Sequence, residues 1–137
     1  MSEPAATGRC LCGGVRYDLH GPLRGVIVCH CVECRRSHGT SGAYTSVPRE
    51  QCALADPQAR LRWFPGPQSV TGGERGFCAA CGSSLFWSAP ERPTISIAAG
   101  TLDGVTGLRT AGHIWDEQRA DWETMDDLPR APRGGAG

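Results

Sequence analysis

Seven of the eight cysteines fall into three clusters with spacings typical of metal binding. The clusters are the pair Cys10 and Cys12, the trio Cys29, Cys31 and Cys34, and the pair Cys78 and Cys81. Structural zinc takes four protein ligands, whereas catalytic zinc takes three and keeps one position open. Four plus three is therefore the simplest division of the seven thiols. The two pairs would build one closed site, and the trio would build one open site where chemistry occurs.

A zinc ion held by three thiolates carries a net negative charge and is a weak Lewis acid, but it binds a fourth sulfur well. Coordination lowers the pKa of a thiol from about 8.5, so the thiolate dominates at neutral pH. The trio therefore favours a zinc enzyme in which a substrate thiol takes the open position. Two alternatives stay open. One is a non-catalytic, zinc-stapled binding module, and the other is a redox or sensor cluster without a catalytic metal.

Several polar residues near the trio could assist such chemistry. Arg35 and Arg36 follow the last cysteine and could offset its charge or grip a substrate carboxylate, although one solvated Arg and one ion pair is the simpler interpretation. His30 lies between two ligands, so we expect a structural role with the ring turned away from the metal. His38 could shuttle a proton, but we favour a turn residue. We expect His113 to be a partly buried histidine with satisfied hydrogen bonds.

Other residues fit structural roles better than functional ones. Asp103 is expected to form a turn by capping backbone amides. Cys52 stands apart from the clusters, so we expect a small, buried, apolar side chain. A core short of aliphatic residues would be filled by the four tryptophans, which are Trp63, Trp87, Trp115 and Trp122.

Composition limits the partners and the source of stability. Leu, Ile, Val and Phe together number only 23 of 137 residues and the formal net charge is zero, so zinc must supply part of the stability. A structural zinc site contributes on the order of 10 kcal/mol. All 14 basic residues are Arg, which excludes lysine Schiff-base chemistry and leaves no polybasic patch for nucleic acid. The sequence carries no signal for an oligomeric state.

Cysteine usage also indicates the compartment. Residues 1–7 have neither the basic start nor the apolar core of a secretory leader, and no run approaches the roughly 20 apolar residues of a membrane span. We therefore expect a cytoplasmic protein that does not bind membranes. In a reducing compartment, clustered cysteines indicate metal sites before disulfides. The odd number of clustered thiols also disfavours disulfide pairing.

The 19 glycines and ten prolines predict an all-β domain of short strands joined by turns. Apolar alternation predicts strands at residues 15–19, 25–29, 43–47, 61–64, 74–77, 85–87, 94–98 and 113–115. One short helical turn is expected at residues 32–38, closed by Gly39, and residues 50–60 read as a loop. We expect a flexible lead at 1–8, a single zinc-binding domain at 9–129 and a disordered tail at 130–137.

Three motifs give the chain a resemblance to the glutathione-dependent formaldehyde-activating enzyme and centromere protein V family. They are GRCLCGGVRY at residues 8–17, CHCVECRR at 29–36 and ERGFCAACGSSLFW at 74–87. GTLD at 100–103, HIW at 113–115, Trp122 and the Leu-Pro pair at 128–129 are similar to the C-terminal signatures of this family.

The resemblance implies an Mss4-like fold of tented β-sheets with zinc knuckles and two zinc ions per chain. It assigns a structural zinc to Cys10, Cys12, Cys78 and Cys81, and a catalytic zinc to Cys29, Cys31 and Cys34. The implied activity is that of a carbon–sulfur lyase that makes or cleaves S-hydroxymethylglutathione, so a small-molecule thiol such as glutathione is the expected partner. This chain is shorter than the enzyme that names the family, so we expect its glutathione pocket to be less complete than the pocket of that enzyme.

Overall fold

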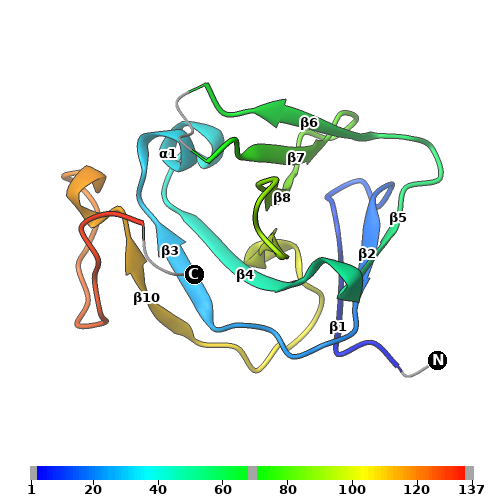
Figure 1. Cartoon of the computed structure of the whole chain (residues 1–137), viewed down its shortest axis with the longest axis horizontal. Coiled ribbons are helices and arrows are strands. Elements are labelled where there is room, and N and C mark those ends of the chain that lie inside the picture. The colour runs from blue at the N-terminus through cyan, green and yellow to red at the C-terminus, as the bar shows by residue number, and fades with distance from the viewer. Residues whose placement is uncertain (1–2, 68–70, 135–137) are drawn as a thin grey trace.

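The computed structural model describes residues 3–67 and 71–134, which form two β-sheets and one α-helix (Figure 1). The strands are β1 (Ala6–Arg9), β2 (Arg16–Leu19), β3 (Val26–Cys29), β4 (Gly42–Pro48), β5 (Cys52–Ala55), β6 (Leu61–Pro65), β7 (Glu74–Cys78), β8 (Ser84–Ser88), β9 (Thr94–Ala98) and β10 (Thr110–Ile114). The helix is α1 (Val32–His38), and short 3-10 turns follow at η1 (Arg49–Gln51), η2 (Ala99–Thr101) and η3 (Asp116–Gln118). The all-β prediction is confirmed, with this one helix added.

The larger sheet has the strand order β10-β3-β4-β9-β8-β7-β6, and the smaller sheet has the order β1-β2-β5. Every described pairing is antiparallel except β10 with β3, which run parallel. That parallel pair carries the C-terminal part of the chain to the side of β3, and Figure 1 shows this orange-to-red segment beside β3 and α1. The edge of the larger sheet therefore lies next to the first residues of the cysteine trio.

The core lies between the two sheets, and two of the metal-type cysteines belong to it. Nine buried residues form its main cluster, which consists of Cys10, Val15, Tyr17, Leu19, Val47, Cys78, Leu85, Phe86 and Ile97. Full burial of an aliphatic side chain contributes about 1.5–3 kcal/mol, so the few aliphatic residues here give limited stability. Because Cys10 and Cys78 lie inside this cluster, a metal held there would stabilise the packing of both sheets.

Local sequence explains the strands and the helix well. In β2, Tyr17 and Leu19 are buried while Arg16 and Asp18 are exposed, as strict alternation requires. Helix α1 begins after Cys31, whose side chain accepts a hydrogen bond from the backbone N–H of Cys34. It ends at Gly39, whose φ of 78° is the left-handed conformation that glycine adopts without steric cost. The prediction of a helical turn at 32–38 is confirmed to the residue.

The prediction of a loop at residues 50–60 is wrong in part. Strand β5 pairs with β2 along its whole length, from Arg16 opposite Ala55 to Leu19 opposite Cys52. Three of its four residues are exposed, so no apolar face marks it in the sequence. Cys52 is half-buried at the margin of the core, which agrees with its expected apolar role.

Strand pairing and hydrogen bonds extend into both of the expected flanking segments. Residues 6–8 of the expected flexible lead lie in β1, which pairs with β2 from Ala6 opposite Leu19 onward. In the expected tail, Arg130 bridges to His113 and the backbone N–H of Ala131 donates to the His113 carbonyl. The flanking residues 1–2 and 135–137 lie outside the described part of the chain.

The tryptophans do not all serve the core. Trp87 packs against the buried cluster that contains Cys34, and Trp63 stacks on Phe86 with ring centroids 6.1 Å apart. Trp63 is nevertheless 39% exposed and Trp122 is 63% exposed, so the predicted core role is wrong for Trp122 and holds only in part for Trp63. Asp103 accepts a hydrogen bond from the Thr7 hydroxyl at 2.8 Å. Within the described residues, no helix has the length and hydropathy needed to span a membrane.

Candidate metal centres

The first candidate centre joins the two cysteine pairs. Cys10, Cys12, Cys78 and Cys81 come from the turn after β1 and the turn after β7, and their four sulfurs all lie within 4.8 Å of one another. Each turn contains a glycine in the left-handed conformation, with φ values of 78° at Gly13 and 79° at Gly82. These glycines let the backbone reverse tightly at each turn, so that both cysteines of a pair face the same point.

Hydrogen-bond donors surround the sulfurs of this four-thiol centre. The backbone N–H of Val15 donates to Cys10 Sγ at 3.4 Å, and Arg60 Nη1 donates to Cys12 Sγ at 3.4 Å. The Ser83 hydroxyl lies 3.2 Å from Cys81 Sγ and lowers the pKa of that thiol to about 5. Such donors favour thiolates, which are the form that binds metal. Four sulfurs in this arrangement fit a closed, structural zinc site.

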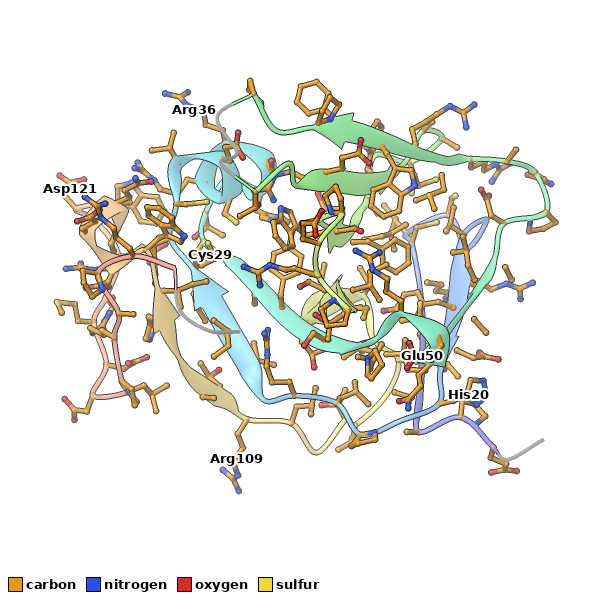
Figure 2. All side chains as sticks on the ribbon, viewed as in Figure 1. His20, Cys29, Arg36, Glu50, Arg109 and Asp121 are labelled. Atoms are coloured by element: carbon orange, nitrogen blue, oxygen red, sulfur yellow. The ribbon has the colours of Figure 1, made fainter. Side chains whose placement is uncertain are left out.

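The second candidate centre is the trio Cys29, Cys31 and Cys34, whose sulfurs also lie within 4.8 Å of one another. Cys29 ends β3, Cys31 caps α1 and Cys34 lies one turn into the helix, so a single strand-to-helix connection positions all three. Figure 2 labels Cys29 where β3 meets α1, toward the interior of the molecule. Among the described residues, no fourth cysteine, histidine or carboxylate joins this group.

The ionisation of the trio indicates how well it fits a cation. Hydrogen bonds from Cys29 and Cys34 lower the pKa of Cys31 to about 2, whereas the hydrogen bond to Cys31 raises the pKa of Cys29 far above its usual range. Ionisation of one sulfur thus disfavours ionisation of its neighbours. Three thiolates at this separation need a positive ion between them, which a thiophilic metal such as zinc supplies.

A half-buried arginine supplies further positive charge beside the trio. Arg75 on β7 donates from Nη2 to Cys34 Sγ at 3.5 Å and from Nη1 to the Tyr44 hydroxyl at 3.5 Å. Burial acts to lower the pKa of Arg75, but the neighbouring Cys34 sulfur outweighs it and the net shift is upward. Arg75 was not among the residues singled out in the sequence, because 41 positions separate it from Cys34 and no spacing rule links them.

The two arginines that follow the trio do not take this role. Arg35 donates from Nη1 to the backbone carbonyl of Gln118 at 3.1 Å, and it thus contacts the C-terminal segment. Arg36 is exposed, and Figure 2 shows it pointing outward from α1. One exposed and one structurally engaged arginine agrees with the simpler interpretation, although Arg35 contacts a carbonyl and not a carboxylate, and Arg75 takes the position beside the sulfurs.

A cavity of about 400 Å³ adjoins the trio. It is lined by Ser37, His38, Ala43, Ser83, Ser84, Ala98, Gly100 and Thr101. Ala98 belongs to the same buried cluster as Cys34 and Tyr44, which places the cavity near the trio. A hydrogen bond of 2.7 Å joins His38 Nε2 to the Tyr44 hydroxyl, and burial followed by the charge of Arg75 lowers the pKa of His38. His38 therefore ends the helix but also faces a cavity, which the interpretation as a turn residue did not include.

His30 and His113 form a buried pair on the other side of the trio. A 2.8 Å hydrogen bond joins His30 Nε2 to His113 Nδ1, and the two rings stack with centroids 5.0 Å apart. Glu123 Oε2 lies 2.9 Å from His30 Nδ1, and Asp126 lies 3.0 Å from His113 Nε2. Both imidazoles are thus engaged away from the sulfurs, in agreement with the structural roles expected for them.

A family model described as glutathione-dependent formaldehyde-activating enzyme matches residues 5–118 of this chain. The chain belongs to this family. A crystal structure of a Rhodobacter sphaeroides protein is similar at a TM-score of 0.59 and 20% identity, and the alignment covers 74% of this chain and 91% of that one. At this identity the similarity shows a shared fold. No curated protein matches the sequence. Family membership indicates glutathione-dependent formaldehyde activation, so the resemblance found in the sequence motifs is confirmed.

Proposed function

We propose that this protein is a zinc-dependent carbon–sulfur lyase that forms or cleaves a thiol–aldehyde adduct, with S-hydroxymethylglutathione as the leading candidate. The observation that carries the proposal is a group of three thiols, with no fourth ligand among the described residues, next to a cavity of about 400 Å³. A cavity of this size lies within the range of small-molecule sites, which is about 300–1,000 Å³. The family match to glutathione-dependent formaldehyde-activating enzymes supports both the thiol and the aldehyde.

The cysteines divide into two roles under this proposal. Cys29, Cys31 and Cys34 would hold the catalytic zinc, and a structural zinc would be held by Cys10, Cys12, Cys78 and Cys81. When bound at the trio, zinc would lower the pKa of a substrate thiol and stabilise the thiolate in both reaction directions. The division rests on the number of sulfurs and on burial, because the four-thiol group lies partly inside the main core whereas Cys34 belongs to a smaller cluster with Ala98, which lines the cavity.

Arg75 would balance the charge that accumulates at the trio. With zinc bound, the three thiolates leave a net charge of about −1, and a fourth thiolate from the substrate would make the site more negative. The guanidinium of Arg75 lies 3.5 Å from Cys34 Sγ and is held by Tyr44, so it offsets part of that charge. We assign to Arg75 the electrostatic stabilisation of the substrate thiolate.

His38 would exchange the proton that the reaction moves. In the forward direction a carbon–sulfur bond forms between the thiol and formaldehyde, and the thiol proton is transferred to the new hydroxyl group. Because burial lowers the pKa of His38, its ring is neutral at pH 7 and can accept this proton. Nε2 is engaged with the Tyr44 hydroxyl, which leaves Nδ1 for the substrate. In the reverse direction the same atoms return the proton to the departing thiol.

Exchange at equilibrium tests this function. Glutathione and formaldehyde combine without an enzyme, so magnetisation transfer between free and adduct methylene signals should be measured with and without protein. We expect the protein to raise the exchange rate above the uncatalysed rate, and the Cys34→Ser variant to remove the increase. A wild-type protein that carries two zinc ions and leaves the exchange rate unchanged for glutathione and for small thiols would refute the proposal.

The compartment proposed for the reaction is the cytoplasm. All eight cysteines are free thiols in the structure, as a reducing environment requires. The non-catalytic binding module differs from the enzyme in metal content at the trio, because it requires zinc only at the four-thiol centre. One zinc per folded chain, measured by mass spectrometry under native conditions, would favour that alternative.

A further inference from the structure

We propose that Gln118 and Glu123 are positioning residues, which hold the three-thiol centre in its metal-binding geometry. This inference rests on the proposed function in one respect, since it takes the trio to be a metal site. Figure 1 shows the orange segment that contains both residues lying beside β3 and α1. The contacts between this segment and the cysteine-bearing connection are specific and come from side chains.

Gln118 holds the start of helix α1. Its side-chain Oε1 accepts a hydrogen bond from the backbone N–H of Val32 at 2.9 Å. The first four N–H groups of a helix lack partners within the helix, so this contact satisfies one of them. The carbonyl of Gln118 also accepts from Arg35 Nη1 at 3.1 Å. Gln118 thus engages the helix at Val32 and Arg35, on both sides of Cys34.

Glu123 holds the two ends of the same connection with one carboxylate. Its Oε2 lies 2.9 Å from Nδ1 of His30, the residue between Cys29 and Cys31. Its Oε1 accepts from the backbone N–H of Ser41 at 3.2 Å and from the Thr40 hydroxyl at 3.3 Å. Residues 30 and 41 enclose α1, so the carboxylate fixes the distance between the strand that enters the centre and the strand that leaves it.

The contact between Glu123 and His30 is shielded from water. The His30 side chain is 2% exposed and that of Glu123 is 11% exposed, so water does not readily replace the carboxylate. Within the described residues no aligned hydrogen bond reaches His30 Nδ1, so the 2.9 Å contact with Glu123 Oε2 is the polar contact that holds this side of the ring. Glu123 also lies beyond residues 5–118, so it is not inferred from the family match.

Outer hydrogen-bond partners set the orientation of metal ligands, and their loss typically costs about 10–100-fold in metal affinity. The same effect is expected here, because movement of His30 or Val32 moves the adjacent cysteines. The four-thiol centre makes none of these contacts. Removal of either positioning side chain should therefore weaken metal binding at the trio and leave the four-thiol centre unchanged.

Cobalt substitution in the full-length chain tests this inference. The zinc is replaced by Co²⁺, and the visible bands and the affinity at each centre are measured by titration with a competing chelator. The Cys34→Ser spectrum identifies the bands of the four-thiol centre. The variants are Glu123→Ala, Glu123→Gln and Gln118→Ala, with Asp121→Asn as the matched control. The Asp121→Asn substitution removes a carboxylate from the same segment, and Figure 2 shows Asp121 at the outer edge of the molecule.

We expect Glu123→Ala and Gln118→Ala to weaken Co²⁺ binding at the trio by about 10–100-fold and to shift its bands, with Asp121→Asn unchanged. Glu123→Gln keeps an oxygen acceptor, so its Co²⁺ affinity at the trio should lie between that of Glu123→Ala and that of the wild type. This variant remains the test if Glu123→Ala does not fold. Equal affinity and identical bands in all variants would overturn the inference, as would equal losses at both centres. Wild-type protein that binds Co²⁺ at the trio but lacks lyase activity would refute the proposed function and leave this inference intact.

Discussion

The charge of Arg75 should be worth a measurable part of catalysis. Two unit charges about 4 Å apart attract by about 4 kcal/mol at the effective dielectric constant of about 20 found near protein surfaces. Burial of the guanidinium offsets part of this, and hydrogen bonds to charged groups contribute a net of about 1.5–3 kcal/mol. Arg75 donates to Cys34 Sγ at 3.5 Å, so we expect the lower part of this range. Arg75→Gln should thus lower kcat/KM by about 10- to 100-fold.

The equilibrium exchange assay measures this loss, and zinc content shows whether the centre survives. Arg75→Lys keeps the positive charge but cannot contact Cys34 and Tyr44 together, so it should recover only part of the activity. Arg36→Gln removes the same charge from an exposed position on α1 and should leave kcat/KM unchanged. Full activity of Arg75→Gln with two zinc ions bound would refute the reasoning, and so would an equal loss in Arg36→Gln.

Three further results are expected. Cys34→Ser should stay folded by circular dichroism, bind one zinc ion and lack activity. Cys78→Ser removes a ligand inside the core, so it should unfold at a temperature far below that of the wild type. The reverse order of stability would contradict the assignment of the two centres. Because burial lowers the pKa of His38 below its usual value, the neutral base is present above about pH 6.5, so kcat/KM should be constant there and decline as the pH falls through the lowered pKa. His38→Gln should be slow and show no such decline, and an unchanged pH profile would exclude His38 as the base. Gly82→Ala has open space for its methyl group but a φ of 79°, so thermal unfolding should show a loss of about 1–2 kcal/mol from backbone strain alone.

The sequence predicts features whose cause is local. Helix α1 was predicted to the residue because its cap, Cys31, and its stop, Gly39, are both adjacent to it. Most strands with an apolar face were found within one residue for the same reason, whereas the start of β10 lies three residues before the expected one. Strand β5 was missed because pairing with β2, and not an apolar face of its own, makes it a strand.

The surroundings of the trio could not be predicted, because their contacts join distant parts of the chain. Arg75 reaches Cys34 across 41 positions, and Glu123 reaches Ser41 across 82. The sequence pattern around a charged residue does not identify the distant residue that it contacts. Only the register of the strands and the path of the C-terminal segment reveal these pairs. The cysteines themselves were identifiable because metal coordination restricts their number and spacing.

The four-thiol centre also shapes the cavity beside the trio. Ser83 lies 3.2 Å from Cys81 Sγ, accepts a hydrogen bond from the backbone N–H of Leu11 at 2.9 Å, and lines the cavity. The Ser83 side chain thus contacts both cysteine turns and forms part of the wall of the cavity. His38 lines the same cavity. A metal ion at the four-thiol centre would hold both turns in place, so it would hold this wall as well. The centre assigned to stability therefore also determines the space in which the substrate thiol would approach the trio.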